Sequence, residues 1–193
     1  MDRTAEIKRK TNETDIKLNI NLDGEGRYDI NTGVGFLDHM IAHLSKHSGI
    51  DINISAKGDY EIDDHHTVED VGIALGGCID KALSDKKGIR RYGFSAVPME
   101  DALAETAIDL SGRPFCVYNA AYPTEKIGTF DTELIEEFLR AMVNNARLNL
   151  HVNVRYGTNS HHIAEAVFKS LGQSLRKAVR VVSDDIPSTK GTL

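Results

Sequence analysis

Two stretches of the chain, HHTVE at 65–69 and HHIAE at 161–165, share the pattern HHxxE. On an α-helix, the first histidine and the glutamate of each copy share a face, whereas the second histidine points about 100° away. The start of each helix therefore presents candidate ligands in two directions. Because imidazole and carboxylate groups bind divalent transition metals, we expect the two copies to serve a pair of metal ions. The candidate ligands are His65, His66, Glu69, His161, His162 and Glu165.

A simpler interpretation is that these side chains only cap their helices, since carboxylates at a helix N-terminus stabilise it by about 0.3–1 kcal/mol. The repetition favours metal binding, because a solvated helix start has no reason to keep three ligand types at one spacing. No cysteine joins the cluster, so the mixed donors suit Mn, Fe, Co, Ni or catalytic Zn better than a closed structural zinc site. His39, His43 and His47 recur every four residues; such a stripe is more often packing or surface, but beside this cluster His39 is a further candidate ligand.

Composition limits the classes of function. The chain has 193 residues, a formal net charge of -6 and no long Lys/Arg block, so we expect a globular protein that does not bind duplex nucleic acid. Its two cysteines, Cys78 and Cys116, lie in apolar stretches, which fits a reducing cytoplasm better than a disulfide framework. No run approaches the roughly 20 apolar residues that span a bilayer, so no membrane partner is expected.

Hydrophobic periodicity predicts the elements that carry these residues. IKLNINL at 16–22 alternates with period two and is followed by DGEG and by RYDIN at 27–31, which predicts a hairpin. A helix is predicted over 35–49, a strand over 50–56, and a second helix from the first HHxxE copy to Leu83. The first half therefore has the order ββαβα.

The second half repeats this order, and its LSG at 110–112 matches LDG at 22–24. The predicted strands are 94–100, 102–110, 113–121 and 148–154, and the predicted helices are 130–147 and one beginning at 159. No low-complexity linker separates the halves. We therefore predict an α+β protein with a single domain over 1–193, made of two pseudo-symmetric halves at about 1–86 and 87–193.

Six motifs occur in order along the chain: FLDHM, DDHHTVEDVGIALG, GIRRYG, LSGRPF, LHVNVRYGTNSHHIAEAVFKSLG and IPSTKG. Together they resemble imidazoleglycerol-phosphate dehydratases nearly end to end. The resemblance implies duplicated ferredoxin-like ββαβα halves whose sheets carry helices on one face. It implies a metal-dependent hydro-lyase that converts D-erythro-imidazoleglycerol phosphate to imidazole-acetol phosphate and water, the sixth step of histidine biosynthesis. It also implies two Mn2+ ions per active site and a cytoplasmic homo-oligomer of about 24 subunits, with metal sites at subunit interfaces.

The family pattern assigns one ion to His39, His66, His161 and Glu165, and the other to His65, Glu69, His162 and one more ligand. Many family members have a histidine at that last position, where this chain has Glu137. We expect Glu137 to complete the second site. His151, His43 or a water molecule are the alternatives.

The resemblance also implies a mechanism for a small phosphorylated imidazole. Metal ions on both ring nitrogens favour the imidazolate, which can expel hydroxide to form a diazafulvene. The family pattern assigns the base that removes the neighbouring proton to Glu13, and Glu69 and Glu165 could also move protons. The phosphate-binding positions correspond to Arg91, Arg113, Lys169, Ser188, Thr189 and Lys190, where arginine can hold phosphate in bidentate geometry.

Two other functions would use the same ligands. A dinuclear metallohydrolase would direct a metal-bound water at a phosphoester or amide. A metal-storage or metal-bridged assembly module would use the HHxxE pairs only to join subunits. The second alternative leaves Arg91, Arg113 and the PSTKG tail without a role.

Overall fold

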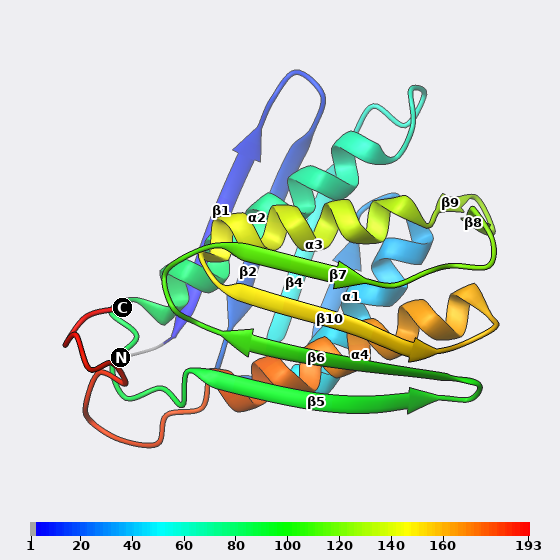
Figure 1. Ribbon diagram of the computed structural model, residues 1–193. Coiled ribbons are helices and arrows are strands. Elements are labelled where there is room, and N and C mark those ends of the chain that lie inside the picture. Colours follow the sequence, from blue (N-terminus) through cyan, green and yellow to red (C-terminus); the bar gives the residue numbers. More distant parts are fainter. Residues whose placement is uncertain (1–2) are drawn as a thin grey trace.

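The computed structural model describes residues 3–193, which form two four-stranded sheets, a two-stranded sheet and four helices (Figure 1). The first half contains β1 (Thr4–Lys10), β2 (Asp15–Asn21), β3 (Tyr28–Asn31), α1 (Gly35–Ser48), β4 (Asp51–Lys57) and α2 (His65–Leu83). The second half contains β5 (Tyr92–Met99), β6 (Ala102–Asp109), β7 (Phe115–Asn119), β8 (Lys126–Ile127), β9 (Phe130–Asp131), α3 (Glu133–Ala146), β10 (Asn149–Tyr156) and α4 (Ser160–Ala178). The large sheets have the orders β1-β2-β4-β3 and β5-β6-β10-β7, so one topology occurs twice.

The helices cover one face of each large sheet and join the two halves (Figure 1). In the first half α2 packs on β1 and β2, and in the second half α4 packs on β5 and β6. Between the halves, α1 packs against α4 and α2 packs against α3. The predicted α+β class, with duplicated halves and helices on one face, is confirmed. Within residues 3–193, no helix combines the length and the apolar composition that crossing a bilayer requires.

The predicted hairpin between residues 16–22 and 27–31 is wrong. Strand β2 pairs with β1 and β4, and β3 pairs in parallel with β4. The Asp51 carboxylate accepts hydrogen bonds from the backbone N–H groups of Glu25 and Arg27, at 2.9 and 2.8 Å. These contacts hold the loop against the start of β4, so that β3 reaches the far edge of β4 instead of turning back on β2.

Strand β1 was not predicted, so the first half is βββαβα rather than ββαβα. The three predicted strands 94–100, 102–110 and 113–121 correspond to β5, β6 and β7, and the second half adds the short strands β8 and β9 before α3. The open face of β1 carries Thr4, Glu6, Lys8 and Lys10, and the face toward the core carries Ala5, Ile7 and Arg9. The apolar alternation is limited to Ala5 and Ile7 and ends at Arg9, so periodicity gives only a short signal here. Charge on an edge strand has its own physical reason, since it discourages pairing with the edge of another molecule.

Two glycines bring the helices of each pair close together. A Cβ on Gly76 of α2 would overlap the Met142 carbonyl oxygen of α3, and a Cβ on Gly172 of α4 would lie 3.0 Å from the Leu44 carbonyl oxygen of α1. Each glycine follows the glutamate of its HHxxE copy by seven residues. The two helix pairs therefore cross at equivalent positions, and each crossing fixes its HHxxE copy against the facing helix.

Substitution of Gly76 by alanine is expected to lower the free energy of unfolding by about 1–3 kcal/mol, because the added methyl group overpacks the α2 and α3 contact. Besides the Met142 oxygen, the new Cβ would lie 2.9 Å from the backbone nitrogen of Ala146. Gly35→Ala is the matched control, since a Cβ there meets no atom within 4 Å. Denaturant titration at one protein concentration measures both variants, and equal stabilities would contradict the close contact.

Candidate functional site

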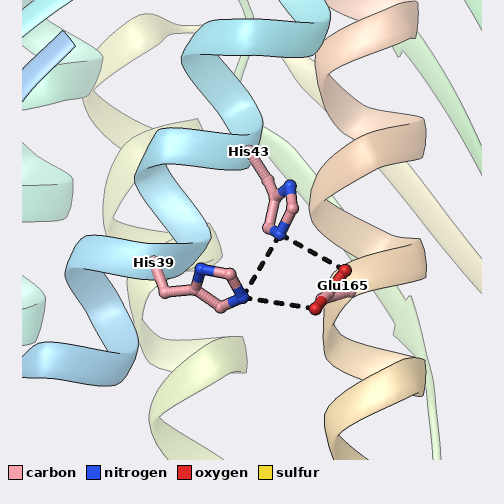
Figure 2. Close-up of side chains that lie close together, drawn as sticks. All are labelled: His39, His43 and Glu165. Atoms are coloured by element: carbon pink, nitrogen blue, oxygen red, sulfur yellow. Dashed lines mark hydrogen bonds and ion pairs between the residues drawn. The ribbon is translucent and has the colours of Figure 1, made fainter.

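One buried carboxylate at the crossing of α1 and α4 gathers three imidazoles. The Oε1 atom of Glu165 lies 3.2 Å from His39 Nε2 and 2.9 Å from His161 Nε2. Its Oε2 atom lies 3.3 Å from His43 Nε2 and 2.5 Å from the Lys169 ammonium. Figure 2 shows the two α1 imidazoles pointing at the carboxylate from the facing helix. Three of the four predicted ligands of the first ion, His39, His161 and Glu165, therefore converge within one chain.

Charge and burial set the ionisation of this cluster. Burial alone would raise the pKa of Glu165, but hydrogen bonds from Lys169, His39 and His161 outweigh it and lower the pKa to about 2. Burial lowers the pKa of His43 to about 4, against the attraction of the Glu165 charge. At neutral pH the cluster therefore contains an ionised carboxylate beside a neutral imidazole. These are the forms that bind metals, and an ion would replace protons that the imidazole nitrogens share with the carboxylate.

The second histidine of each HHxxE copy is oriented by an acidic residue. His66 donates from Nδ1 to Asp59 Oδ2 at 2.9 Å, and His162 donates from Nδ1 to Asp101 Oδ1 at 2.5 Å. The first hydrogen bond raises the pKa of His66, and the second lowers the pKa of Asp101. Both rings keep Nε2 available, which is the usual arrangement of a metal-ligating histidine with a carboxylate behind it. The donor set thus fits a divalent cation.

Asp59 had no predicted role. The sequence feature that could have pointed to it is its position six residues before the first HHxxE copy, in the acidic stretch GDYEIDDHH. Asp101 is the acidic residue behind His162 in the second half. The structure shows that it also accepts the backbone N–H of Asn159 at 3.0 Å, so it holds the start of α4 together with His162.

His66 lies apart from the other predicted ligands of the first ion. Its contacts are Asp59 and Glu13, whose Oε1 atom lies 3.9 Å from His66 Nε2. Within residues 3–193, no hydrogen bond or ion pair joins His66 to the Glu165 cluster. Within a single chain, the predicted ligands of the first ion are therefore divided between His66 and the Glu165 cluster.

The predicted ligands of the second ion are also not joined by any hydrogen bond or ion pair within the described part of the chain; they are His65, Glu69, His162 and Glu137. Glu137 precedes Met142 by five residues, as His39 precedes Leu44. The equivalent helix crossings therefore place Glu137 on α3 where α1 has His39. Neither alternative histidine lies there, since His43 faces Glu165 and His151 is exposed on β10, 6.4 Å from the Phe115 ring.

Five of the six predicted phosphate-binding residues line one cavity of about 600 Å³; they are Arg91, Arg113, Ser188, Thr189 and Lys190. Arg91 is already engaged there. Its guanidinium donates to both oxygens of Asp109, at 2.6 and 3.1 Å, and to the Pro187 carbonyl oxygen at 2.8 Å. The hydrogen bond with Asp109 raises the pKa of Arg91, so this side chain stays charged while it ties the tail to β6. The sixth residue, Lys169, lies instead on Glu165.

The cavity and the histidine cluster lie at opposite ends of α4. The backbone N–H of Arg91 donates to the carbonyl oxygen of Ala178, the last residue of α4, whereas Glu165 is near its start. Thirteen residues of helix between Glu165 and Ala178 span about 20 Å at 1.5 Å per residue. Figure 1 shows the C-terminal segment at that far end of the helix. The two groups of predicted residues are thus well separated within one chain.

Comparison with known proteins identifies the family. The sequence profile described as imidazoleglycerol-phosphate dehydratase matches residues 32–175. The imidazoleglycerol-phosphate dehydratases of Cereibacter sphaeroides and Bacillus licheniformis are 58% and 57% identical to the chain, over 99% of its length and 100% of theirs. The crystal structure of the Staphylococcus aureus dehydratase matches with a TM-score of 0.85 at 42% identity, over 93% of this chain and 99% of that one. The Pyrococcus furiosus structure matches with a TM-score of 0.85 at 34% identity, over 97% and 100%. The chain therefore belongs to the imidazoleglycerol-phosphate dehydratase family.

Proposed function

We propose that the chain dehydrates D-erythro-imidazoleglycerol phosphate to imidazole-acetol phosphate, as the sixth step of histidine biosynthesis requires. The observation that carries this proposal is the convergence of His39, His161 and Glu165 at the helix crossing, in a chain of this family. The carboxylates behind His66 and His162 support it, because they orient both rings for metal binding. A cytoplasmic location remains a prediction from the sequence.

The proposed cofactor is a pair of Mn2+ ions, held by the two ligand sets that the family pattern assigns. When bound, the ions would act as Lewis acids on the two ring nitrogens and favour the imidazolate, from which hydroxide leaves to give a diazafulvene. The buried Glu165 supplies a negative charge at neutral pH, and its neighbours His39 and His161 supply imidazole nitrogens. Glu137 takes the place of a histidine and adds charge to the second set.

Glu13 is the proposed base, and the fold fixes its position. The loop that carries Glu13 is held to α2 by Asp70, which accepts from Thr14 Oγ1 at 2.5 Å and from Arg9 Nη2 at 2.7 Å. Asp70 is buried, so these contacts exclude solvent on one side of the loop. Glu13 itself stays half exposed beside His66, where its carboxylate can receive a proton from a bound substrate.

The proposed active site is shared between copies of the chain. The substrate has a few single bonds of about 1.5 Å between its ring and its phosphate, so it cannot span the ~20 Å that separates the two groups of residues along α4. We therefore expect a second copy to bring the tail cavity to the histidine cluster. Assembly would also supply His66 to the Glu165 cluster. We expect a large homo-oligomer of about 24 subunits, as family members are expected to form.

One open sheet face supports this assembly. Tyr92, Phe94 and Phe115 project from the second sheet with 54%, 57% and 60% of their surface exposed. Strand pairing places Phe94 beside Ala107, which extends the apolar surface. The open face of the first sheet is polar, with Glu6 and Lys8 on β1 and similar residues on its neighbours. Exposed apolar patches of this kind mark interaction surfaces, and a second copy of this chain is the occupant we propose.

A product assay tests the proposed function. The purified chain with Mn2+ should convert imidazoleglycerol phosphate to a ketone with loss of water, and exhaustive chelation should remove the activity. Mass spectrometry of the product and an assay for free phosphate distinguish the alternatives. Release of inorganic phosphate without dehydration would favour a dinuclear metallohydrolase, and metal-dependent assembly without any turnover would favour a structural metal module.

A further inference from the structure

Four ligand atoms of three residues lie close together at the α1 and α4 crossing within one chain. His39 Nε2 lies 3.3 Å from His43 Nε2 and 3.2 Å from Glu165 Oε1, and His43 Nε2 lies 3.3 Å from Glu165 Oε2 (Figure 2). Together these residues supply one ligand atom each within a sphere that an ion can occupy. The family pattern does not include His43 in this set.

These separations match a metal coordination shell. Adjacent ligands lie about 3.1 Å apart around an octahedral ion with bonds of about 2.2 Å, and about 3.4 Å apart around a tetrahedral ion with bonds of about 2.1 Å. The observed 3.2 and 3.3 Å fall between these values, with His39 beside Oε1 and His43 beside Oε2 of the carboxylate. Two imidazoles and one carboxylate on a common face leave the remaining positions open for other ligands. One of these can be His161, which already contacts Glu165 at 2.9 Å.

Packing alone does not account for the direction of the His43 ring. His47, one turn further along α1, belongs to the same stripe and stacks on His43 with ring centroids 5.9 Å apart. Within residues 3–193, His47 has no hydrogen bond or ion pair with Glu165, whereas His43 Nε2 lies 3.3 Å from Glu165 Oε2. Lys169 also lies on Oε2, so an ion beside His43 would share the charge of the carboxylate with this ammonium.

We propose that His39, His43 and Glu165 form a divalent-cation site contained in one chain, in which His43 is a metal ligand. This inference rests on the proposed metal-dependent function and deepens it. A three-ligand site within the chain lets each subunit load one ion without the His66 of another copy. His66 then joins an ion that is already held.

Mn2+ binding to the metal-stripped full-length protein tests the inference. Replacement of a residue behind a ligand commonly weakens metal binding 10- to 100-fold, so loss of a direct ligand in His43→Gln should weaken one class of Mn2+ site at least tenfold. Pulsed EPR of the loaded protein should detect one imidazole nitrogen fewer. The matched control is His47→Gln, which changes the same stripe but leaves the Glu165 contacts in place, and it should bind Mn2+ as the wild type does.

Circular dichroism and gel filtration identify variants that fail to fold, and His43→Asn is a second variant if glutamine disturbs the helix contact. Mn2+ affinity and imidazole count unchanged in a folded His43 variant would overturn the inference. The outcomes for the two proposals are separable. If the wild type binds Mn2+ through His43 but does not dehydrate the substrate, the His43 inference stands and the proposed function fails. If the wild type is active and His43→Gln binds Mn2+ with wild-type affinity, the proposed function stands and the His43 inference fails.

Discussion

Replacement of Glu165 by glutamine is expected to reduce kcat for dehydration by about 10³-fold, because a Lewis acid contributes several kcal/mol and this carboxylate is its only charged ligand on α4. The Glu165 side chain is 8% exposed and contacts His39, His43, His161 and Lys169. Its pKa of about 2 means that the substitution removes a negative charge across the whole working pH range. Glutamine keeps the size of the side chain and one acceptor oxygen, so the core should remain folded.

The measurements are steady-state kinetics with Mn2+ in excess and Mn2+ titration of the stripped protein. Glu136→Gln is the matched control, since Glu136 also forms an ion pair with a residue four positions later, Arg140, on a helix. The control should keep wild-type kcat. A decrease in kcat of less than about tenfold in Glu165→Gln corresponds to less than about 1.4 kcal/mol of activation free energy. Such a decrease would be too small for the loss of a direct metal ligand.

Local sequence patterns predicted the elements that carry the site but not all of their contacts. The HHxxE copies could be placed at helix starts because the 3.6-residue period continues for several turns beyond each of them. The fourfold spacing of His39 and His43 follows from the same period. What periodicity cannot give is which helix faces which. The crossing that brings His43 to Glu165 depends on Gly172, whose missing side chain matters only when α1 lies on it.

The parts that were missed depend on tertiary contacts or on polar side chains. Strand β1 has only Ala5 and Ile7 as apolar residues on its inner face, and the pairing of β3 is decided by Asp51, which is distant in sequence from the loop that it holds. Asp59 orients His66 through one hydrogen bond, and its place in the acidic stretch before the HHxxE copy does not reveal that contact. Arg91 looked like a free phosphate ligand, yet Asp109 shares its guanidinium. Contacts of this kind can be read only once the fold is known.

Mixing two inactive variants is expected to restore activity if the active site is built from two copies of the chain. One variant is Glu165→Gln, which disables the histidine cluster. The other carries both Arg113→Ala and Lys190→Ala, which removes two cations from the tail cavity. Arg113 and Lys190 are exposed, so their loss should raise KM for the phosphorylated substrate without lowering stability much.

Assembled alone, each variant has a defect in every site. In an oligomer assembled at random from equal amounts, about one quarter of the sites combine an intact cluster from one copy with an intact cavity from another, so about a quarter of wild-type activity should return at low substrate. Co-expression with two affinity tags isolates the mixed oligomers. Glu165→Gln mixed with His161→Ala is the control, because Glu165 and His161 lie in the same cluster of one chain and no site escapes both defects. If the cluster and the cavity of one chain served the same substrate, the first mixture would stay as inactive as its components. The tail would then have to move across the ~20 Å separation along α4, and no second subunit would be needed.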